Sequence, residues 1–412
     1  MKVETNSNAK HWAIKVSIVV IISLMLLIPL AMIDNVISNR EMAKIQVIDN
    51  VSKSFAGKQI VGGPILYYTV VTEQTDGSAS LQTKTICPSE LDYKVNVTTD
   101  ILHRSIYDVI VYNSTIEITG KLPVRKDALS AVRQSIKIHI DDVKGITSIS
   151  PIKLGEKSYN LERGGVASVQ TDIELPHSVK DDSEIDFAIT VHLKGTESLK
   201  FRMEGDETAI CMNSSYPHPS FQGDYLPQTR DVSDDGFYAT WRLLKINRDN
   251  DNCAVGVKFI NPADSYQQSA RSVDYGLLII TLVFVVGLLV ELITRKEINV
   301  IQYAVIGLSL ALFYSLLFSF SEFVVFGFAY LIAATMTTAA LMLYFRAILK
   351  NRSAYLLGGF VAFVYIVNYI LLQMEVYAML AGSLVLFVML SVFMYFTANL
   401  NSEKTELIKS KE

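Results

Sequence analysis

Six long apolar runs constrain this chain of 412 residues more than any other feature of its sequence. They cover residues 16–33, 275–294, 300–320, 323–345, 353–372 and 376–398. An α-helix rises about 1.5 Å per residue, so about 20 residues cross a hydrocarbon layer about 30 Å thick. The sequence therefore predicts an α-helical membrane protein with six transmembrane helices. Half of all residues are hydrophobic and 19% are charged, which excludes a disordered chain and a wholly cytosolic enzyme.

The first run, residues 16–33, can be read as a secretory signal or as an anchor that stays in the membrane. It is longer than the usual signal core of about 7 to 15 residues, and no small-residue cleavage site follows it. Both observations favour the anchor, with Pro29 tolerated as a kink near its outer end. Residues 36–56 are expected to continue this helix out of the membrane as far as Gly57.

Positive charges beside the short loops predict the orientation of the helices, because Lys and Arg are in excess on the cytoplasmic side of membrane proteins. If the N-terminus is cytoplasmic, the six crossings place these residues on the same side: Arg295, Lys296, Arg346, Lys350, Arg352, Lys404, Lys409 and Lys411. The opposite short loops, 321–322 and 373–375, contain neither Lys nor Arg. Both termini are therefore expected in the cytoplasm, and residues 34–272 are expected to be exported.

The exported stretch has the pattern of β-strands. Residues 136–140 and 187–193 alternate apolar and polar side chains, which places one face on a core and the other in solvent. Further β-rich runs, separated by turn signals, cover residues 65–72, 105–119, 236–246 and 255–260. We expect an all-β domain of two antiparallel layers that resembles a sandwich.

A change of composition near residue 262 separates this domain from the helices that follow. All ten prolines lie at or before Pro262, as expected where a β domain with turns gives way to packed membrane helices. The expected parts are a cytoplasmic N-terminus with the first helix, an exported β-rich domain, a bundle of five helices and a cytoplasmic tail. Their bounds are 1–33, 34–272, 273–400 and 401–412.

The sequence contains none of the common catalytic or nucleotide-binding signatures. It has no phosphate-binding loop, no Gly-x-Ser-x-Gly elbow and no His-Glu-x-x-His pair. The six histidines are scattered at positions 11, 103, 139, 177, 192 and 218, without the spacing of metal ligands. The slightly acidic charge, with both signs interspersed, gives no reason to bind nucleic acid. We therefore expect no enzyme activity, no metal, no cofactor and no nucleic-acid partner.

Three cysteines, Cys87, Cys211 and Cys253, lie in the exported stretch. An oxidising compartment would allow one disulfide and leave one thiol over, but spacing alone does not choose the pair. Buried free thiols are the other interpretation. Both interpretations stay open at the level of the sequence.

The predicted spans contain no ionisable side chain at membrane depth. Ion-coupled transporters and proton relays normally carry such groups there, because a moving charge must be bound. The polar residues that remain, such as Ser309 and Asn368, suit hydrogen bonds between helices. Glu291 is expected to pair at the interface with Arg295, one turn later. The apolar part therefore has the character of an anchor or scaffold.

One segment stands apart, between Tyr216 and Pro227. Its three prolines predict a stiff extended loop, and Tyr216, Phe221 and Tyr225 supply aromatic anchors. The segment can be a rigid connection packed on the β domain, an interaction surface for an envelope partner or for the protein's own helices, or the site of a catalytic His218. The candidate interaction surface comprises Pro217, His218, Pro219, Ser220, Phe221, Gly223, Asp224, Tyr225, Leu226, Pro227 and Trp241.

The same segment carries a resemblance to a known family. The block Pro-His-Pro-Ser-Phe-x-Gly-Asp-aromatic-Leu-Pro at 217–227, with Gly236-Phe237 and Trp241 after it, resembles the CreD family of bacterial inner-membrane proteins. Similar blocks occur at 262–267 and 307–314, and Val61-Gly62-Gly63-Pro64 has one glycine more than the family's Val-Gly-Pro. The resemblance implies a Gram-negative inner membrane, a periplasmic β domain, and a role in cell-envelope integrity and colicin tolerance.

These observations favour a protein of envelope maintenance that sits in the lipid bilayer and binds or scaffolds through its periplasmic domain. One alternative is a transporter or channel for an uncharged or amphipathic envelope component, which predicts a polar cavity among the C-terminal helices. Another is an envelope enzyme, which predicts that His218 and Asp224 converge in a pocket.

Overall fold

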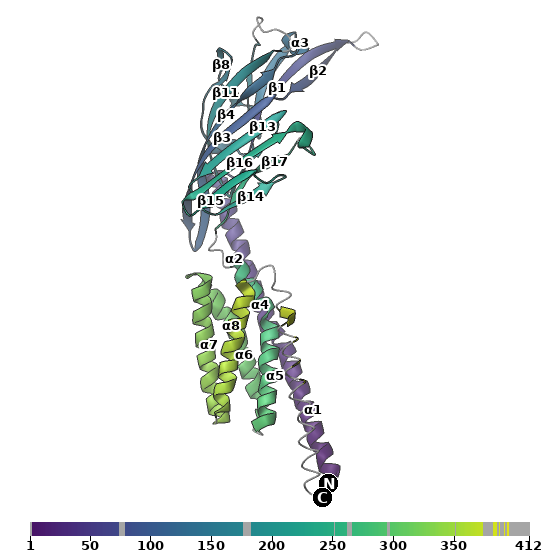
Figure 1. Ribbon diagram of the computed structural model, residues 1–412, viewed down its shortest axis with the longest axis vertical. Coiled ribbons are helices and arrows are strands. Elements are labelled where there is room, and N and C mark those ends of the chain that lie inside the picture. The colour runs from purple at the N-terminus through teal and green to yellow at the C-terminus, as the bar shows by residue number, and fades with distance from the viewer. Residues whose placement is uncertain are drawn as a thin grey trace. The chain divides into compact units, whose positions relative to one another are not determined.

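The computed structural model describes residues 2–73, 79–175, 183–250, 252–261, 266–294, 297–350 and 352–373, with six further positions between 382 and 394. The chain divides into two compact units (Figure 1). One unit combines Met1–Met42 with Ala263–Glu412, and the other is Ala43–Pro262. The predicted sixth span, 376–398, lies outside the described residues apart from those six positions.

The N-terminal helix is nearly continuous. Helix α1 covers Lys2–Met25 and α2 covers Leu27–Ser54, so helical structure extends well past the apolar run, as predicted. The interruption at Leu26 has a local cause, since Pro29 has no N–H. The carbonyl of Met25, four residues earlier, therefore has no backbone donor to continue the helix at that point. The boundary between the two units falls within α2.

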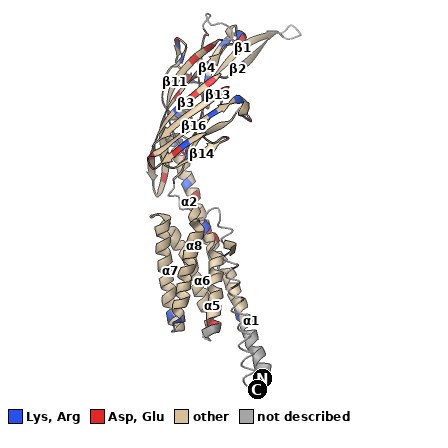
Figure 2. Ribbon diagram, viewed as in Figure 1, with Lys and Arg blue, Asp and Glu red and all other residues tan. Residues whose placement is uncertain are grey.

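The C-terminal helices are α4 (Tyr266–Asp274), α5 (Gly276–Thr294), α6 (Val300–Ser321), α7 (Phe326–Leu349) and α8 (Ser353–Gln373). In the described part of the chain, four helices are long and apolar enough to cross a membrane, namely the N-terminal helix over Ile14–Ser54 and helices α6, α7 and α8. A fifth span results if α4 and α5, bent by 41°, are counted together. Figure 2 shows that these helices carry few charged residues along their length. Within its described residues, the structure thus supports four or five of the six predicted spans.

Helix α6 occupies the middle of the helical unit and contacts α1, α4, α5 and α7. A capping box fixes its start, since the Asn299 side chain accepts from the Ile301 N–H at 3.3 Å and the Gln302 side chain accepts from the Asn299 N–H at 2.9 Å. Aromatic rings fill the space between α6, α7 and α8. The ring centroid of Phe313 lies 5.3 Å from that of Tyr330 and 4.3 Å from that of Tyr365.

The second unit is built from two β-sheets. In order, the first contains β14 (Pro219–Gly223), β17 (Ala254–Phe259), β12 (Ser198–Arg202), β1 (Gln59–Glu73), β5 (Arg133–Ile140), β10 (Ser168–Asp172) and β9 (Glu162–Arg163), with β2 (Ala79–Ile86) on β1. The second contains β15 (Thr229–Ser233), β16 (Gly236–Leu244), β13 (Glu207–Ser214), β3 (Glu90–Arg104), β4 (Tyr107–Pro123), β11 (Glu184–Thr196), β7 (Ile152–Leu154) and β8 (Lys157–Tyr159), with β6 (Ile146–Ile149) on β11. A single-turn helix, α3 (Lys126–Leu129), follows β4.

The expectation of purely antiparallel sheets is wrong. Among the described strands each sheet contains one parallel pair, β1 with β12 and β3 with β13, while the other pairs are antiparallel. A parallel pair needs a long connection between its strands, and here more than a hundred residues separate the partners. Alternation of apolar residues identifies a strand but does not identify its partner, so the sequence pattern could not reveal these pairs.

The core of this unit lies between the two sheets. The predicted alternation is confirmed, since Ile136, Ile138 and Ile140 are buried on β5, and β11 buries every second residue over most of its length. The rings of Tyr93 on β3 and Phe201 on β12 join the two layers with centroids 5.0 Å apart. Two facing layers with a common apolar core form the sandwich-like domain that the strand pattern predicted.

The three cysteines are free thiols in the structure. Cys253 is buried, and Cys87 and Cys211 are partly exposed. The Cys211 thiol donates to the Tyr238 hydroxyl at 3.3 Å. Burial, together with the nearby Asp224 carboxylate, raises the pKa of the Cys253 thiol to about 11. Cys253 is therefore a protonated, unreactive thiol at neutral pH.

Candidate functional site

The segment singled out by the sequence lies at one edge of both sheets. We call residues 217–233 the edge segment. It forms β14, which pairs with β17 as the outermost strand of the first sheet, then a turn, and then β15, which pairs with β16 as the outermost strand of the second sheet. One short stretch of chain therefore supplies an edge strand to each layer of the sandwich.

Aromatic side chains hold the edge segment on the domain. The Phe221 ring meets Phe237 at 5.8 Å and Trp241 at 5.9 Å between centroids, both edge to face. Trp241 is 2% exposed, and its indole N–H donates to the Tyr225 carbonyl at 3.3 Å. The Tyr225 hydroxyl donates to the Asn247 carbonyl at 2.7 Å. These contacts match the rigid, aromatic-anchored connection that the sequence suggested.

The structure does not bring His218 and Asp224 together. They flank β14 at opposite ends, and six residues of extended chain span about 20 Å. The His218 carbonyl accepts from the Ile260 N–H at 3.2 Å. The Asp224 carboxylate accepts from the Ala254 N–H at 3.0 Å. Both residues thus fasten the edge strand to its neighbours, and the pocket expected for an envelope enzyme is not formed by this pair.

Gly223 ends β14 in a conformation that requires glycine. Its φ angle is +122°, and an added Cβ would lie 2.1 Å from the carbonyl oxygen of Ala254. A residue with a side chain would meet both backbone strain and a direct clash. Gly223 therefore allows the sharp turn that carries the chain from the first sheet to the second.

The outer surface of the edge segment is accessible. Leu226, in the turn between β14 and β15, is 68% exposed, and every residue of β15 is exposed. Pro217, Pro219, Ser220 and Pro227 are half-buried. The predicted surface therefore has two sides, an inner one of aromatic rings that packs on the domain and an outer one that is free to meet another molecule.

A buried carboxylate in the β domain, Glu204, with the charged residues beside it, was not found from the sequence. Glu204 is 8% exposed, and its carboxylate accepts from the Gly63 N–H at 2.8 Å and lies 3.6 Å from the Arg202 guanidinium. Arg202 in turn reaches the His139 ring nitrogen at 3.1 Å. Burial raises the pKa of Glu204 from its ordinary value, against the opposing effects of Gly63 and Arg202.

The signal for this cluster was the pair Gly62-Gly63. A Cβ at Gly62 would lie 2.7 Å from a Glu204 carboxylate oxygen, so only glycine leaves room for that carboxylate. The register of β1 against β5 shifts between Val61 and Pro64, which marks a β-bulge at the two glycines. The extra glycine noted in the sequence therefore coincides with the bulge beside Glu204.

Two ion pairs connect the N-terminal helix to the C-terminal helices within the helical unit. Lys15 pairs with Glu291, which is 1% exposed and also accepts from the Tyr303 hydroxyl at 3.2 Å. Arg40 lies 3.6 Å from the Glu322 carboxylate. The sequence suggested Arg295 as the partner of Glu291, but Arg295 lies outside the described residues, and the structure shows Lys15 in contact with that carboxylate.

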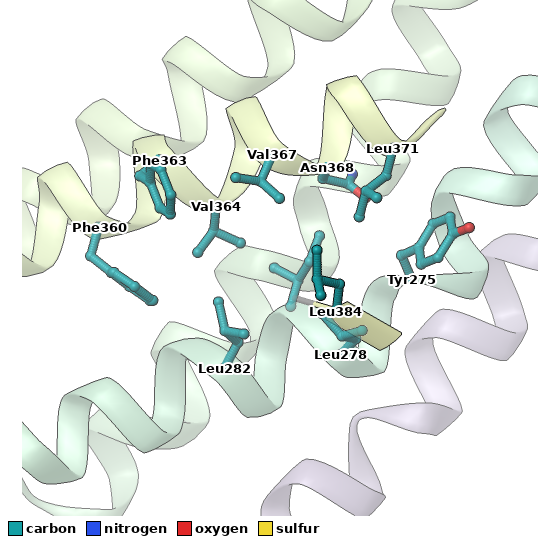
Figure 3. Close-up of a pocket in the computed structure, with 11 residues that line it drawn as sticks. Tyr275, Leu278, Leu282, Phe360, Phe363, Val364, Val367, Asn368, Leu371 and Leu384 are labelled. Carbon is teal, nitrogen blue, oxygen red and sulfur yellow. The ribbon is translucent and has the colours of Figure 1, made fainter. Parts of the chain in front are cut away.

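Two apolar cavities lie among the C-terminal helices. The first has a volume of about 190 Å³ and lies between α5 and α8, with Tyr275 and Asn368 as polar residues and Leu384 also in its wall (Figure 3). The second, of about 830 Å³, is a groove between α7 and α8. Both are lined mainly by aliphatic and aromatic side chains, so neither provides the polar cavity that the transporter alternative predicts.

The family model described as inner membrane protein CreD matches residues 11–403. Inner membrane protein CreD of Escherichia coli (strain K12) is 29% identical in an alignment of 430 positions that covers 94% of this chain and 93% of that protein.

Among solved structures, the M1 zinc metallopeptidase from Deinococcus radiodurans is similar at a TM-score of 0.22, with 9% identity and 42% of each chain covered. A two-domain M1 zinc metallopeptidase mutant bound to L-tryptophan gives a TM-score of 0.21, with 10% identity over 42% of this chain and 44% of that one. These likenesses are too weak to carry an argument about fold or activity.

Proposed function

This chain belongs to the CreD family of inner membrane proteins, and from that premise we propose that its β domain lies in the periplasm and binds an envelope partner there. The helices would then anchor the domain, and the edge segment would supply the binding surface. The proposed role is the maintenance of envelope integrity by binding, with no chemical step.

Charge placement supports this topology. Lys15 and Arg40 are 25 residues apart on the first helix, which corresponds to about 37 Å along a helix, close to the thickness of a bilayer with part of its interfaces. Lys15 meets Glu291 near the end of α5, and Arg40 meets Glu322 at the end of α6. The ends of α5 and α6 must lie on opposite sides of a membrane, because the two helices are consecutive spans. The two ion pairs therefore agree with a Lys15 on the cytoplasmic side and an Arg40 on the periplasmic side.

The observation that carries the proposal is the exposed edge strand β15. An edge strand presents unpaired backbone groups, and an extended segment of a partner can add to it as a further strand. β15 is accessible on both faces, whereas β14 begins at Pro219, which has no N–H to donate. Pairing with β16 holds β15 in position, and the aromatic contacts of Phe221 hold the strand before it, so little ordering is needed when a partner binds.

Strand geometry identifies the groups that a partner would use. β15 and β16 are joined by the two-residue turn Asp234-Asp235, and the closing pair is Ser233 with Gly236. In a hairpin of this length the closing pair is hydrogen-bonded, and alternate residues then point their N–H groups away from the neighbour. We therefore expect the N–H groups of Arg230 and Val232 to be available to an added strand.

Photocrosslinking in living cells tests the proposal. A photoreactive amino acid at Leu226 or Val232 is expected to capture an envelope protein, and one at Leu81, which is 71% exposed on β2, is expected not to. Val232→Pro removes the outward N–H and should abolish capture from Leu226. The matched control Val232→Thr keeps the N–H and the branched shape, and it should leave capture unchanged. Equal capture in both variants, or equal capture from Leu81, would refute strand addition at β15.

A further inference from the structure

We infer that the cavity between α5 and α8 is a binding site for a membrane amphiphile, one whose aliphatic chain ends in a hydrogen-bond donor such as a hydroxyl group. The inference does not rest on the proposed role of the β domain, because it concerns the helical unit alone. Two observations support it: the shape and lining of the cavity, and the buried, unpaired amide oxygen of Asn368.

The lining suits an aliphatic chain. The walls are formed by Leu278 and Leu282 of α5 and by Phe360, Val364 and Leu371 of α8, among other apolar residues. The volume of about 190 Å³ exceeds the ~150 Å³ of an apolar cavity that takes up a benzene molecule. Residues 360 to 371 of α8 line it over about 16 Å of helix, so the cavity is long enough for a chain rather than a compact molecule.

Asn368 is buried in this cavity with one polar atom unpaired. It is 2% exposed, and its amide nitrogen donates to the Tyr330 hydroxyl at 3.1 Å. Its amide oxygen has no hydrogen-bond partner among the described residues. An unpaired carbonyl in an apolar or membrane environment is energetically unfavourable, so the site favours a molecule that brings a donor.

The orientation of the amide follows from its neighbour. The Tyr330 hydroxyl already donates its proton to the Tyr365 carbonyl at 2.8 Å. It can therefore only accept from Asn368, which assigns the nitrogen to Tyr330 and leaves the oxygen unpaired. A ligand for this oxygen must be a donor, so a hydroxyl fits and an ether or a methyl ester does not.

The polar and apolar parts of the cavity are separated along its length. Figure 3 shows Tyr275 and Asn368 toward one end and Phe360 at the other. Asn368 lies five residues before the end of α8, about 8 Å along the helix from that end. A polar head at Asn368 would thus lie near a membrane interface, while the chain would run past Leu282 and through the middle of the bilayer toward Phe360.

Photolabelling of the full-length protein in phosphatidylcholine nanodiscs tests this site. The probe is a 12-carbon primary alcohol with a diazirine in its chain, and its matched control is the methyl ether of the same molecule. The alcohol should label peptides of α5 and α8 at least 10-fold more than the ether. Equal labelling of the wild-type protein by the two probes would overturn the inference. This result is expected if the cavity holds only water, and also if it admits any alkyl chain.

Three variants locate the labelling. Asn368→Leu removes the acceptor and should lower labelling by the alcohol at least 10-fold. Leu278→Trp fills the cavity but keeps Asn368, and it should abolish labelling. This variant tests the site even if Asn368→Leu fails to fold. Ala339→Trp places the same ring in the groove between α7 and α8, and it should change nothing. Undiminished labelling of folded Asn368→Leu or of Leu278→Trp contradicts the site.

Discussion

Replacement of Glu204 tests whether a buried carboxylate limits the stability of the β domain. Glu204→Gln keeps an acceptor for the Gly63 N–H but removes the charge. Glu204→Leu removes both. An unpaired buried N–H costs about 1–3 kcal/mol, so we expect Glu204→Leu to lower the free energy of unfolding by about 2 kcal/mol. Glu204→Gln should be at least as stable as the wild type at pH 7.5, because burial disfavours the charged form.

The pH dependence gives the sharper result. The pKa of Glu204 is raised in the folded state above its ordinary value of 4.5. The folded protein therefore holds this proton more tightly than the unfolded chain. The stability that the protonated group contributes is fully present below pH 4.5 and is lost as the pH rises through the folded pKa. The difference in unfolding free energy, wild type minus Glu204→Gln, should accordingly fall with rising pH over this window.

Urea unfolding of the full-length protein in nanodiscs measures these differences. The chain has two tryptophans, so a Trp12→Phe background leaves the buried Trp241 as the reporter of the β domain. Subtraction of the two variants removes the contributions of other titrating groups. A difference that stays constant or rises with pH would refute the assignment of burial as the dominant effect. Equal stability of Glu204→Gln and Glu204→Leu would show that the Gly63 hydrogen bond contributes nothing.

Two further substitutions probe other features. Gly223→Ala should destabilise the β domain by about 2–3 kcal/mol in urea unfolding, because it combines a strained φ with a clash against Ala254. The control Gln222→Ala, one residue earlier, should cost less than about 1 kcal/mol. Lys15→Met should lower the stability of the helical unit by about 3–5 kcal/mol in thermal unfolding, since it leaves the Glu291 charge buried, and adding Glu291→Met should restore most of the loss. A double variant no better than Lys15→Met would argue against a buried ion pair.

The helices and strands could be predicted where the residue types themselves indicate which positions are buried. The isoleucines at 136, 138 and 140 alternate with polar residues, and they lie on the core face of β5. The apolar runs likewise became α5 to α8, with ends close to those expected. The parallel pairing of β1 with β12 could not be predicted, because it depends on contacts between segments far apart in the chain.

The candidate sites differ in how far they could be recognised from the sequence. Prolines and aromatic residues made the edge segment conspicuous, but its division between two sheets is a matter of pairing and could not be read from composition. Glu204 stands among charged residues in the sequence and looks solvated there. Its burial depends on the bulge at Gly62 and Gly63, which only the folded chain brings close. Asn368 was recognisable as a polar residue in a span, but its unpaired oxygen depends on Tyr330 and Tyr365.

The parallel pairs also impose an order on folding. Gln59 of β1 lies opposite Leu199, and Glu90 of β3 lies opposite Glu207, so each early strand must wait for a partner made more than a hundred residues later. During synthesis the hairpins β1–β2 and β3–β4 can close early, and β5 can then pair with the other side of β1. The start of β1, from Gln59 to Val61, and the far side of β3 stay open on one side until β12 and β13 arrive. Open strand edges invite aggregation, so the nascent β domain is exposed to this hazard until residue 214 has emerged.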